Sequence, residues 1–140
     1  MAEISFTIPL QPRGQARARS SVICGHAHVY KGKQQVVAEG QLAALVAPHC
    51  PPAPWTGAVE LCVRAYLPVP SAWSRKKKAA ALAGELRYTK KPDLDNIVKH
   101  LKDVLSGMVY ADDKQIVSLC ADKCYGDPPR WCVNVREVPA

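Results

Sequence analysis

A stripe of apolar side chains between residues 97 and 108 constrains the fold more than any other feature of this sequence. Its members recur at intervals of three and four residues, the spacing that places side chains on one face of an α-helix: Ile97, Val98, Leu101, Val104, Leu105 and Met108. Pro92 disfavours helix at the residue before it, Asp93 is a good N-cap, and Gly107 is a suitable stop. We therefore predict a helix that begins at about Leu94 and buries this face.

Charged side chains occupy the side of the predicted helix that faces away from the stripe. Asp95 and Lys99 are four residues apart and share that side, while Asp93 lies at the helix mouth. After a short turn, Asp112 and Asp113 come just ahead of an apolar, β-branched run, 116–120, which is typical of a strand. Acids from a helix start and a strand edge could therefore meet around one or two cations.

Each of these elements also has an ordinary structural explanation. Asp93 could only cap the helix, and Asp95 with Lys99 could form a surface ion pair that contributes roughly 0.3–0.5 kcal/mol. Asp112 and Asp113 could belong to an ordinary turn. The combination of all three features is rarer than any one of them.

The charge balance favours a metal site that acts on phosphate. The chain has 19 Lys and Arg residues against 12 Asp and Glu, a net charge of +7. A basic surface attracts nucleic acid, whereas isolated carboxylates repel it, and a divalent cation between carboxylate and phosphate removes that conflict. Oxygen ligands select Mg²⁺ or Mn²⁺. In-line attack by an activated water would leave a 5′-phosphate and a 3′-hydroxyl, with Lys99 stabilising charge or orienting the water.

Basic residues elsewhere are candidates for DNA contacts. Three lie in a stretch rich in Pro, Gly and Gln that we predict to be a loop, four begin a short predicted helix that runs through 79–83 to Gly84, and two precede the acidic motif: Arg13, Arg17, Arg19, Arg75, Lys76, Lys77, Lys78, Lys90 and Lys91. A run of charges is also typical of a solvated face. Trp73, beside the run, could stack on an unpaired base or simply pack.

Periodicity predicts one small α+β domain over residues 1–140, a mixed sheet packed with helices. Strands are expected where apolar residues alternate, at 4–8, 59–67, 116–120 and 131–135, and helices at 33–47, at the basic run and at the motif. The expected order is β-α-β-α-α-β-β. The last two strands are compatible with a hairpin, which favours α+β over a doubly wound parallel sheet.

The sequence predicts a cytoplasmic location. It contains no run of about 18 apolar residues and no charged region followed by an apolar core at its start. The six cysteines are then expected to be reduced thiols. A zinc site at Cys24, His26 and His28, or at Cys120 and Cys124, is an alternative, but these spacings are not those of a recognised zinc module.

The chain resembles the RusA family of Holliday-junction resolvases, which is common in bacteriophages and prophages. The resemblance is carried by Lys91-Pro92-Asp93-Leu94-Asp95-Asn96-Ile97-Val98-Lys99 together with Ala111-Asp112-Asp113-Lys114-Gln115-Ile116-Val117. Further segments look like the phage-type branch of the family: Ile8-Pro9-Leu10 followed by Arg17, Arg19 and Tyr30, then Ser71 to Lys78, Tyr88-Thr89-Lys90, and Lys123 to Gly126. The resemblance thus runs across most of the chain.

This resemblance implies a homodimeric endonuclease, dependent on Mg²⁺ or Mn²⁺, that cuts four-way DNA junctions by paired nicks. It implies Asp93, Asp95 and Asp113 as the metal-binding carboxylates, with Asp112 adjacent and Asp113 favoured as the main ligand of the two. Lys99 matches the catalytic lysine. A four-way junction is approximately two-fold symmetric, so a C2 dimer would supply the second site. The 108–110 turn and the first strand are candidate dimer surfaces.

Two other classes of function remain open. A non-enzymatic, structure-selective DNA-binding module would use the same basic residues while the acids only cap and pair. A metal-dependent nucleotidyl or phosphoryl transferase could also use an Asp-x-Asp pair, but the glycine-rich phosphate cradle expected of that class is absent.

Overall fold

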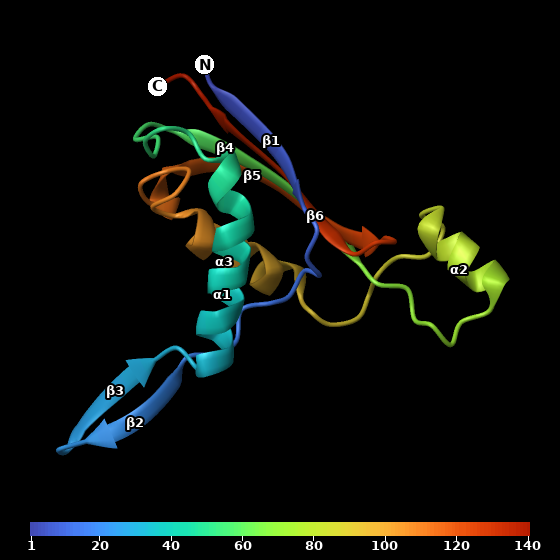
Figure 1. Cartoon of the computed structure of the whole chain (residues 1–140), viewed down its shortest axis with the longest axis horizontal. Coiled ribbons are helices and arrows are strands. Elements are labelled where there is room, and N and C mark those ends of the chain that lie inside the picture. The colour runs from blue at the N-terminus through green and yellow to red at the C-terminus, as the bar shows by residue number, and fades with distance from the viewer.

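The computed structural model describes residues 1–140 and has one mixed sheet with helices on one of its faces (Figure 1). The elements follow in the order β1 (Glu3–Ile8), β2 (Arg19–Ile23), β3 (His26–Tyr30), α1 (Lys33–Val46), the 3₁₀ turn η1 (Ala47–His49), β4 (Val59–Leu67), α2 (Arg75–Leu82), α3 (Leu94–Leu105), the 3₁₀ turn η2 (Asp113–Gln115), β5 (Ile116–Tyr125) and β6 (Arg130–Glu137). The predicted α+β class with a mixed sheet is confirmed. The predicted order lacked β2 and β3.

The sheet has the strand order β1-β6-β4-β5. β6 is antiparallel to both β1 and β4, while β4 and β5 are parallel, with Cys62 opposite Cys120. The expected hairpin of the last two strands is therefore wrong, because β4 lies between them. The physical reason is burial: alternate residues of β4 are all buried, as befits a central strand, whereas half of β5 is exposed and only its last residue is buried at the sheet edge. A parallel pair also requires a long crossover, which α2 and α3 provide.

The core lies between the sheet and α1 and α3, where 19 buried residues form one cluster. The predicted stripe of α3 is buried from Ile97 to Leu105, and the helix begins at Leu94 as expected. Helix α1 contributes Leu42 and Val46, and Trp131 of β6 is fully buried beneath the helices. This packing fixes α3 on the sheet and leaves its charged side in solvent.

A two-stranded hairpin of β2 and β3, which we did not predict, projects away from the body (Figure 1). Cys24 and Gly25 form its turn, both with positive φ, 51° and 76°; such two-residue turns match the twist of the strands. The three residues considered above as a possible zinc site, Cys24, His26 and His28, lie in this turn and in β3. Arg19, expected in a loop, is the first residue of β2 and pairs with Tyr30.

Helix α2 stands on an arm on the opposite side of the molecule from the hairpin (Figure 1). Its bounds agree with the prediction, because Ser74 caps it by accepting a hydrogen bond from the Lys77 N–H and Gly84 follows it with φ of 82°. No helix in the structure is long and apolar enough to span a bilayer.

Candidate active site

The start of α3 is held by bonds to the chain that leads into it. Lys123 Nζ donates to the carbonyls of Lys90 and Pro92 at 2.7 and 2.9 Å, and the Tyr88 hydroxyl donates to the carbonyl of Lys91 at 2.9 Å. Asp93 occupies the N-cap position, but its side chain makes no capping hydrogen bond. The carboxylate of Asp93 is therefore exposed and free for another ligand, unlike that of an ordinary cap.

An open cavity of about 780 Å³ lies on the charged side of α3. Its polar lining comes from α3 and from η2, and its apolar lining from α3 and β5: Asp95, Asn96, Lys99, Lys102, Asp103 and Asp113, with Leu94, Val98, Leu119 and Ala121. The structure thus brings Asp95, Lys99 and Asp113 to one cavity, as the spacing predicted. The ion pairs in the structure are Lys31–Glu39, Arg64–Asp122 and Arg136–Glu60. The alternative of a surface ion pair between Asp95 and Lys99 is therefore not what the structure has.

The two adjacent acids of η2 have different surroundings. Asp112 caps the turn: its carboxylate accepts from the Lys114 N–H at 3.0 Å, which lowers its pKa, and its own N–H donates to Gln115 Oε1 at 2.7 Å. Gln115 in turn binds the carbonyls of Trp55 and Gly57. Asp113 makes no such bond and lines the cavity. The turn explanation therefore accounts for Asp112 and leaves Asp113 free.

Asp93 faces a separate, neighbouring hollow of about 510 Å³, which it shares with Arg13 and Lys91. A third hollow, of about 440 Å³, contains Arg17 and Lys99. Asn96, on which we placed no expectation, lines all three. The acids are thus distributed over two adjacent hollows, both flanked by basic side chains.

The donor set fits a hard cation, although it is spread out. Carboxylate and amide oxygens of Asp95, Asn96 and Asp113 line the same cavity, and such oxygens are the ligands of Mg²⁺ and Mn²⁺. No group of three or more His, Cys, Asp or Glu side chains is close enough together to form a ready-made metal cluster. Mg²⁺ is commonly bound by only one or two carboxylates, with substrate phosphate and water as the other ligands, so the spread-out acids suit a site that the substrate phosphate completes.

The other predicted DNA contacts, apart from Arg19 on the hairpin, fall into two groups. Arg13, Arg17 and Lys91 line the hollows beside the cavity. Those of α2, from Arg75 to Lys78, stand apart on the arm. There, Trp73 packs on Tyr125, with ring centroids 5.4 Å apart, and the ammonium groups of Lys77 and Lys90 lie 4.1 and 5.4 Å from its ring centroid. Trp73 is therefore engaged in packing.

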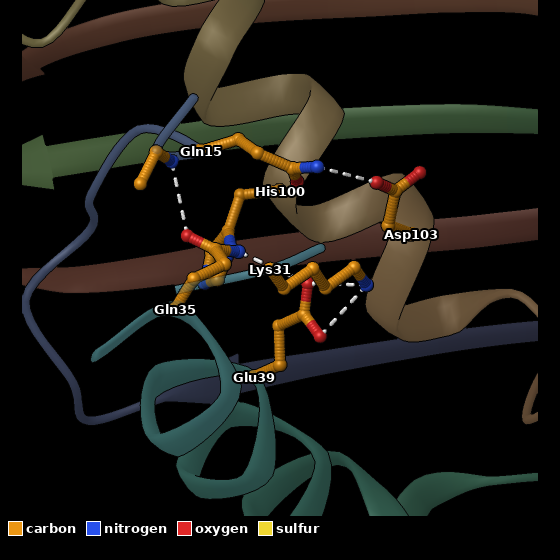
Figure 2. A network of polar contacts seen from close by, with 7 residues as sticks. Gln15, Lys31, Gln35, Glu39, His100 and Asp103 are labelled. Atoms are coloured by element: carbon orange, nitrogen blue, oxygen red, sulfur yellow. Dashed lines mark hydrogen bonds and ion pairs between the residues drawn. The ribbon is translucent and has the colours of Figure 1, made fainter. Parts of the chain in front are cut away.

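A buried polar network behind the cavity was missed from the sequence (Figure 2). It joins the loop after β1 to α1 and α3 through Gln15, Gln35, His100 and Asp103. Asp103 could have been found, because it follows Asp95 and Lys99 at intervals of four on one helix face. Gln35 and His100 carry no local signal, since their partners lie in distant segments.

Comparison with known proteins identifies the family of the chain. Residues 9–136 match the family Endodeoxyribonuclease RusA. The uncharacterized protein YqaN of Bacillus subtilis (strain 168) is 39% identical over 139 residues, which cover 98% of each chain. The crossover junction endodeoxyribonuclease rusA of Lactococcus phage r1t is 41% identical over 51 residues, 36% of this chain and 39% of that protein. With acids and basic residues gathered on α3 and a match across most of its length, the chain belongs to the RusA family of endodeoxyribonucleases.

Proposed function

We propose that the protein is a metal-dependent endonuclease that resolves four-way DNA junctions by paired symmetric nicks. The observation that carries the proposal is the cavity on α3, where Asp95, Lys99 and Asp113 meet beside two hollows that contain Arg13 and Arg17. Family membership supports action on DNA, and the name of the phage relative supports a crossover junction as the substrate.

Asp95 and Asp113 are the proposed ligands of Mg²⁺, or of Mn²⁺ in its place, with Asp93 at the adjacent hollow. Asp112 is a weaker candidate, because its carboxylate is engaged by the Lys114 N–H. When bound, such a cation supplies charge neutralisation at the phosphate and makes water more acidic. Asn96 lies between the hollows and can orient a phosphate oxygen or a water by hydrogen bonding.

Lys99 lines both the cavity and the hollow of Arg17. Its ammonium group can therefore stabilise the negative charge that develops on the scissile phosphate or on the departing 3′ oxygen. Arg13, Arg17 and Lys91 are suited to bind the neighbouring phosphates, because guanidinium and ammonium groups pair strongly with them. The expected products are a 5′-phosphate and a 3′-hydroxyl.

The proposed enzyme is a homodimer, because each chain contributes one cavity with these acids and a symmetric junction requires two nicks. The 108–110 turn is a poor dimer surface, since Val109 and Tyr110 are fully buried in their own core. β1 remains a candidate, because it is an edge strand of the sheet.

Cleavage of an immobile synthetic four-way junction tests the proposal, with linear duplex of the same sequences as the control substrate. We expect paired nicks that require Mg²⁺, disappear in EDTA, and are lost in Asp95→Asn while junction binding persists. If the wild type binds the junction tightly but does not cut it in Mg²⁺ or Mn²⁺, the protein is a DNA-binding module and the catalytic roles are wrong.

A further inference from the structure

The segment Gln11–Ala18, which we call the strap, connects β1 to β2 and crosses the start of α3. Its Gln15 N–H donates to the carbonyl of Asn96 at 3.1 Å. At Gly14 the approach is so close that an added Cβ would lie 3.1 Å from the Cβ of Asn96 and 3.3 Å from that of Pro92. The strap therefore lies directly on the acidic motif, with Arg13 and Arg17 on either side of the crossing.

A side-chain bond fastens the strap to the cavity wall. Gln15 Nε2 donates to Asp103 Oδ2 at 2.8 Å (Figure 2). Gln15 Oε1 is buried and has no hydrogen-bond partner. The polar atoms of buried amides are usually both paired. Here the carboxylate repels the amide oxygen and attracts the amide nitrogen, so Asp103 dictates the orientation of Gln15.

A second bond, to the buried side chain of Gln35, fastens the next residue of the strap. Gln35 Oε1 accepts from the Ala16 N–H at 3.0 Å, and Gln35 Nε2 donates to Glu39 Oε1 at 3.0 Å and to His100 Nδ1 at 3.1 Å. Gln35 and His100 are 2% and 1% exposed. Gln15 and Ala16 are thus immobilised on α3 and α1. Arg13 lies two residues before Gln15, and Arg17 lies one residue after Ala16. Each arginine lines its own hollow.

We propose that Gln15 and Asp103 are positioning residues, a latch that holds the strap so that Arg13 and Arg17 face the phosphates on either side of the scissile one. The inference rests on the proposed nuclease function. Asp103 lines the same cavity as Asp95 and Asp113, so the competing role is that of a further cation ligand. The latch requires only a hydrogen-bond acceptor at position 103, whereas a carboxylate ligand binds a cation much more weakly once its charge is removed.

Three variants separate these roles: Asp103→Asn, Asp103→Ala and Gln15→Ala. Asparagine keeps an oxygen that accepts from Gln15 but carries no charge. We expect the single-turnover cleavage rate of a four-way junction to stay within about threefold of wild type in Asp103→Asn and to fall at least tenfold in both alanine variants. The double alanine variant should be no slower than either single one, because both remove the same bond. The Mg²⁺ concentration for half-maximal rate should not change.

Amide hydrogen exchange of residues 11–18, measured on the full chain without DNA, gives a readout that does not need activity. The strap should exchange at least tenfold faster in Gln15→Ala and Asp103→Ala than in wild type and Asp103→Asn. Gln15→Ala alters a loop residue and serves as the second test should Asp103→Ala fail to fold. If strap exchange is unchanged in the alanine variants, or if Asp103→Asn is as slow as Asp103→Ala while Gln15→Ala is normal, the latch is wrong. Absence of cleavage in the wild type would overturn the proposed function, and the exchange data would then still decide on the latch.

Discussion

Two basic segments, the strap beside the acidic cavity and the arm of α2 farther from it, are held in different ways. The strap carries Arg13 and Arg17 and is fixed by directional hydrogen bonds to α1 and α3. The arm of α2 is held by aromatic packing and by ammonium groups over the Trp73 ring, and α2 has no extensive contact with any other element. Hydrogen bonds lose their strength steeply with misalignment, whereas packing on a ring tolerates sliding. The strap is therefore suited to fix geometry at the reacting phosphate, and the arm to add affinity.

The largest expected effect comes from removing two charges from one segment at a time. In Arg13→Ala/Arg17→Ala, the single-turnover rate at saturating junction should fall by more than about 100-fold, because two charge-assisted hydrogen bonds are lost and each is worth about 1.5–3 kcal/mol. In the matched variant Lys76→Ala/Lys78→Ala, that rate should hold while the junction Kd rises about 10-fold. The measurement is cleavage under single turnover, together with binding in EDTA.

The salt dependence of junction binding gives a further test of the same two variants. If both lysines of the arm meet phosphates, the slope of log K against log salt should become shallower by about 1.8 units in the arm variant, close to 0.9 for each lost contact. Equal losses of cleavage rate in the strap and arm variants would contradict the assignment of a geometric role to the strap and an affinity role to the arm.

A second effect of comparable energy concerns stability rather than rate. Gln35→Ala should lower the free energy of unfolding by about 1–3 kcal/mol, because it leaves the buried His100 Nδ1 without a partner and removes the acceptor of the part-buried Ala16 N–H. Gln34→Ala, a substitution at an exposed neighbour on α1, is the matched control. Urea unfolding of both variants checks this. A Gln35→Ala protein as stable as its control would mean that the strap is not held by this network.

Periodicity predicted α3 and β4 because each has one face in the core, so apolar residues mark that face. The same signal is absent in β2 and β3, because nearly every residue there is exposed, including the valines Val22 and Val29. That hairpin depends on turn geometry at Cys24 and Gly25, and a cysteine with positive φ is an unusual choice for such a turn.

The candidate site was predictable to the extent that it lies on one helix. Asp95 and Lys99 share a face of α3 by spacing alone, and the structure places them at one cavity. Asp93 was expected to converge with them but lines the next hollow, and the residue before it, Pro92, is held there by its carbonyl bond to Lys123. Gln35 and its bond to Ala16 could not be predicted, since a buried amide has no pattern until its distant partner is known.

The smallest expected effect is a pH dependence that the strap network should show and the arm should not. Burial lowers the pKa of His100, and Arg13 lowers it further, while Glu39 and Asp103 oppose the shift. His100 Nδ1 accepts from Gln35, so the folded protein favours the neutral ring. As the pH falls below the unfolded value of about 6.5, the unfolded chain takes up a proton before the folded one does. Stability should therefore fall from about pH 7 toward pH 5, by up to about 1.4 kcal/mol per pH unit.

Urea unfolding at pH 5, 6, 7 and 8 measures this dependence, with His100→Asn as the comparison. The difference in unfolding free energy between wild type and His100→Asn should be largest at pH 8 and shrink toward pH 5, because only the wild type loses stability through this group. Asp112 works in the same direction but only at far lower pH: the Lys114 N–H lowers the pKa of its carboxyl in the folded chain, so the unfolded chain takes up the proton first and stability falls there too. A difference that stays constant from pH 8 to pH 5 would show that His100 does not couple the strap to pH. The strap would then be a latch of hydrogen bonds with no titrating member in this range.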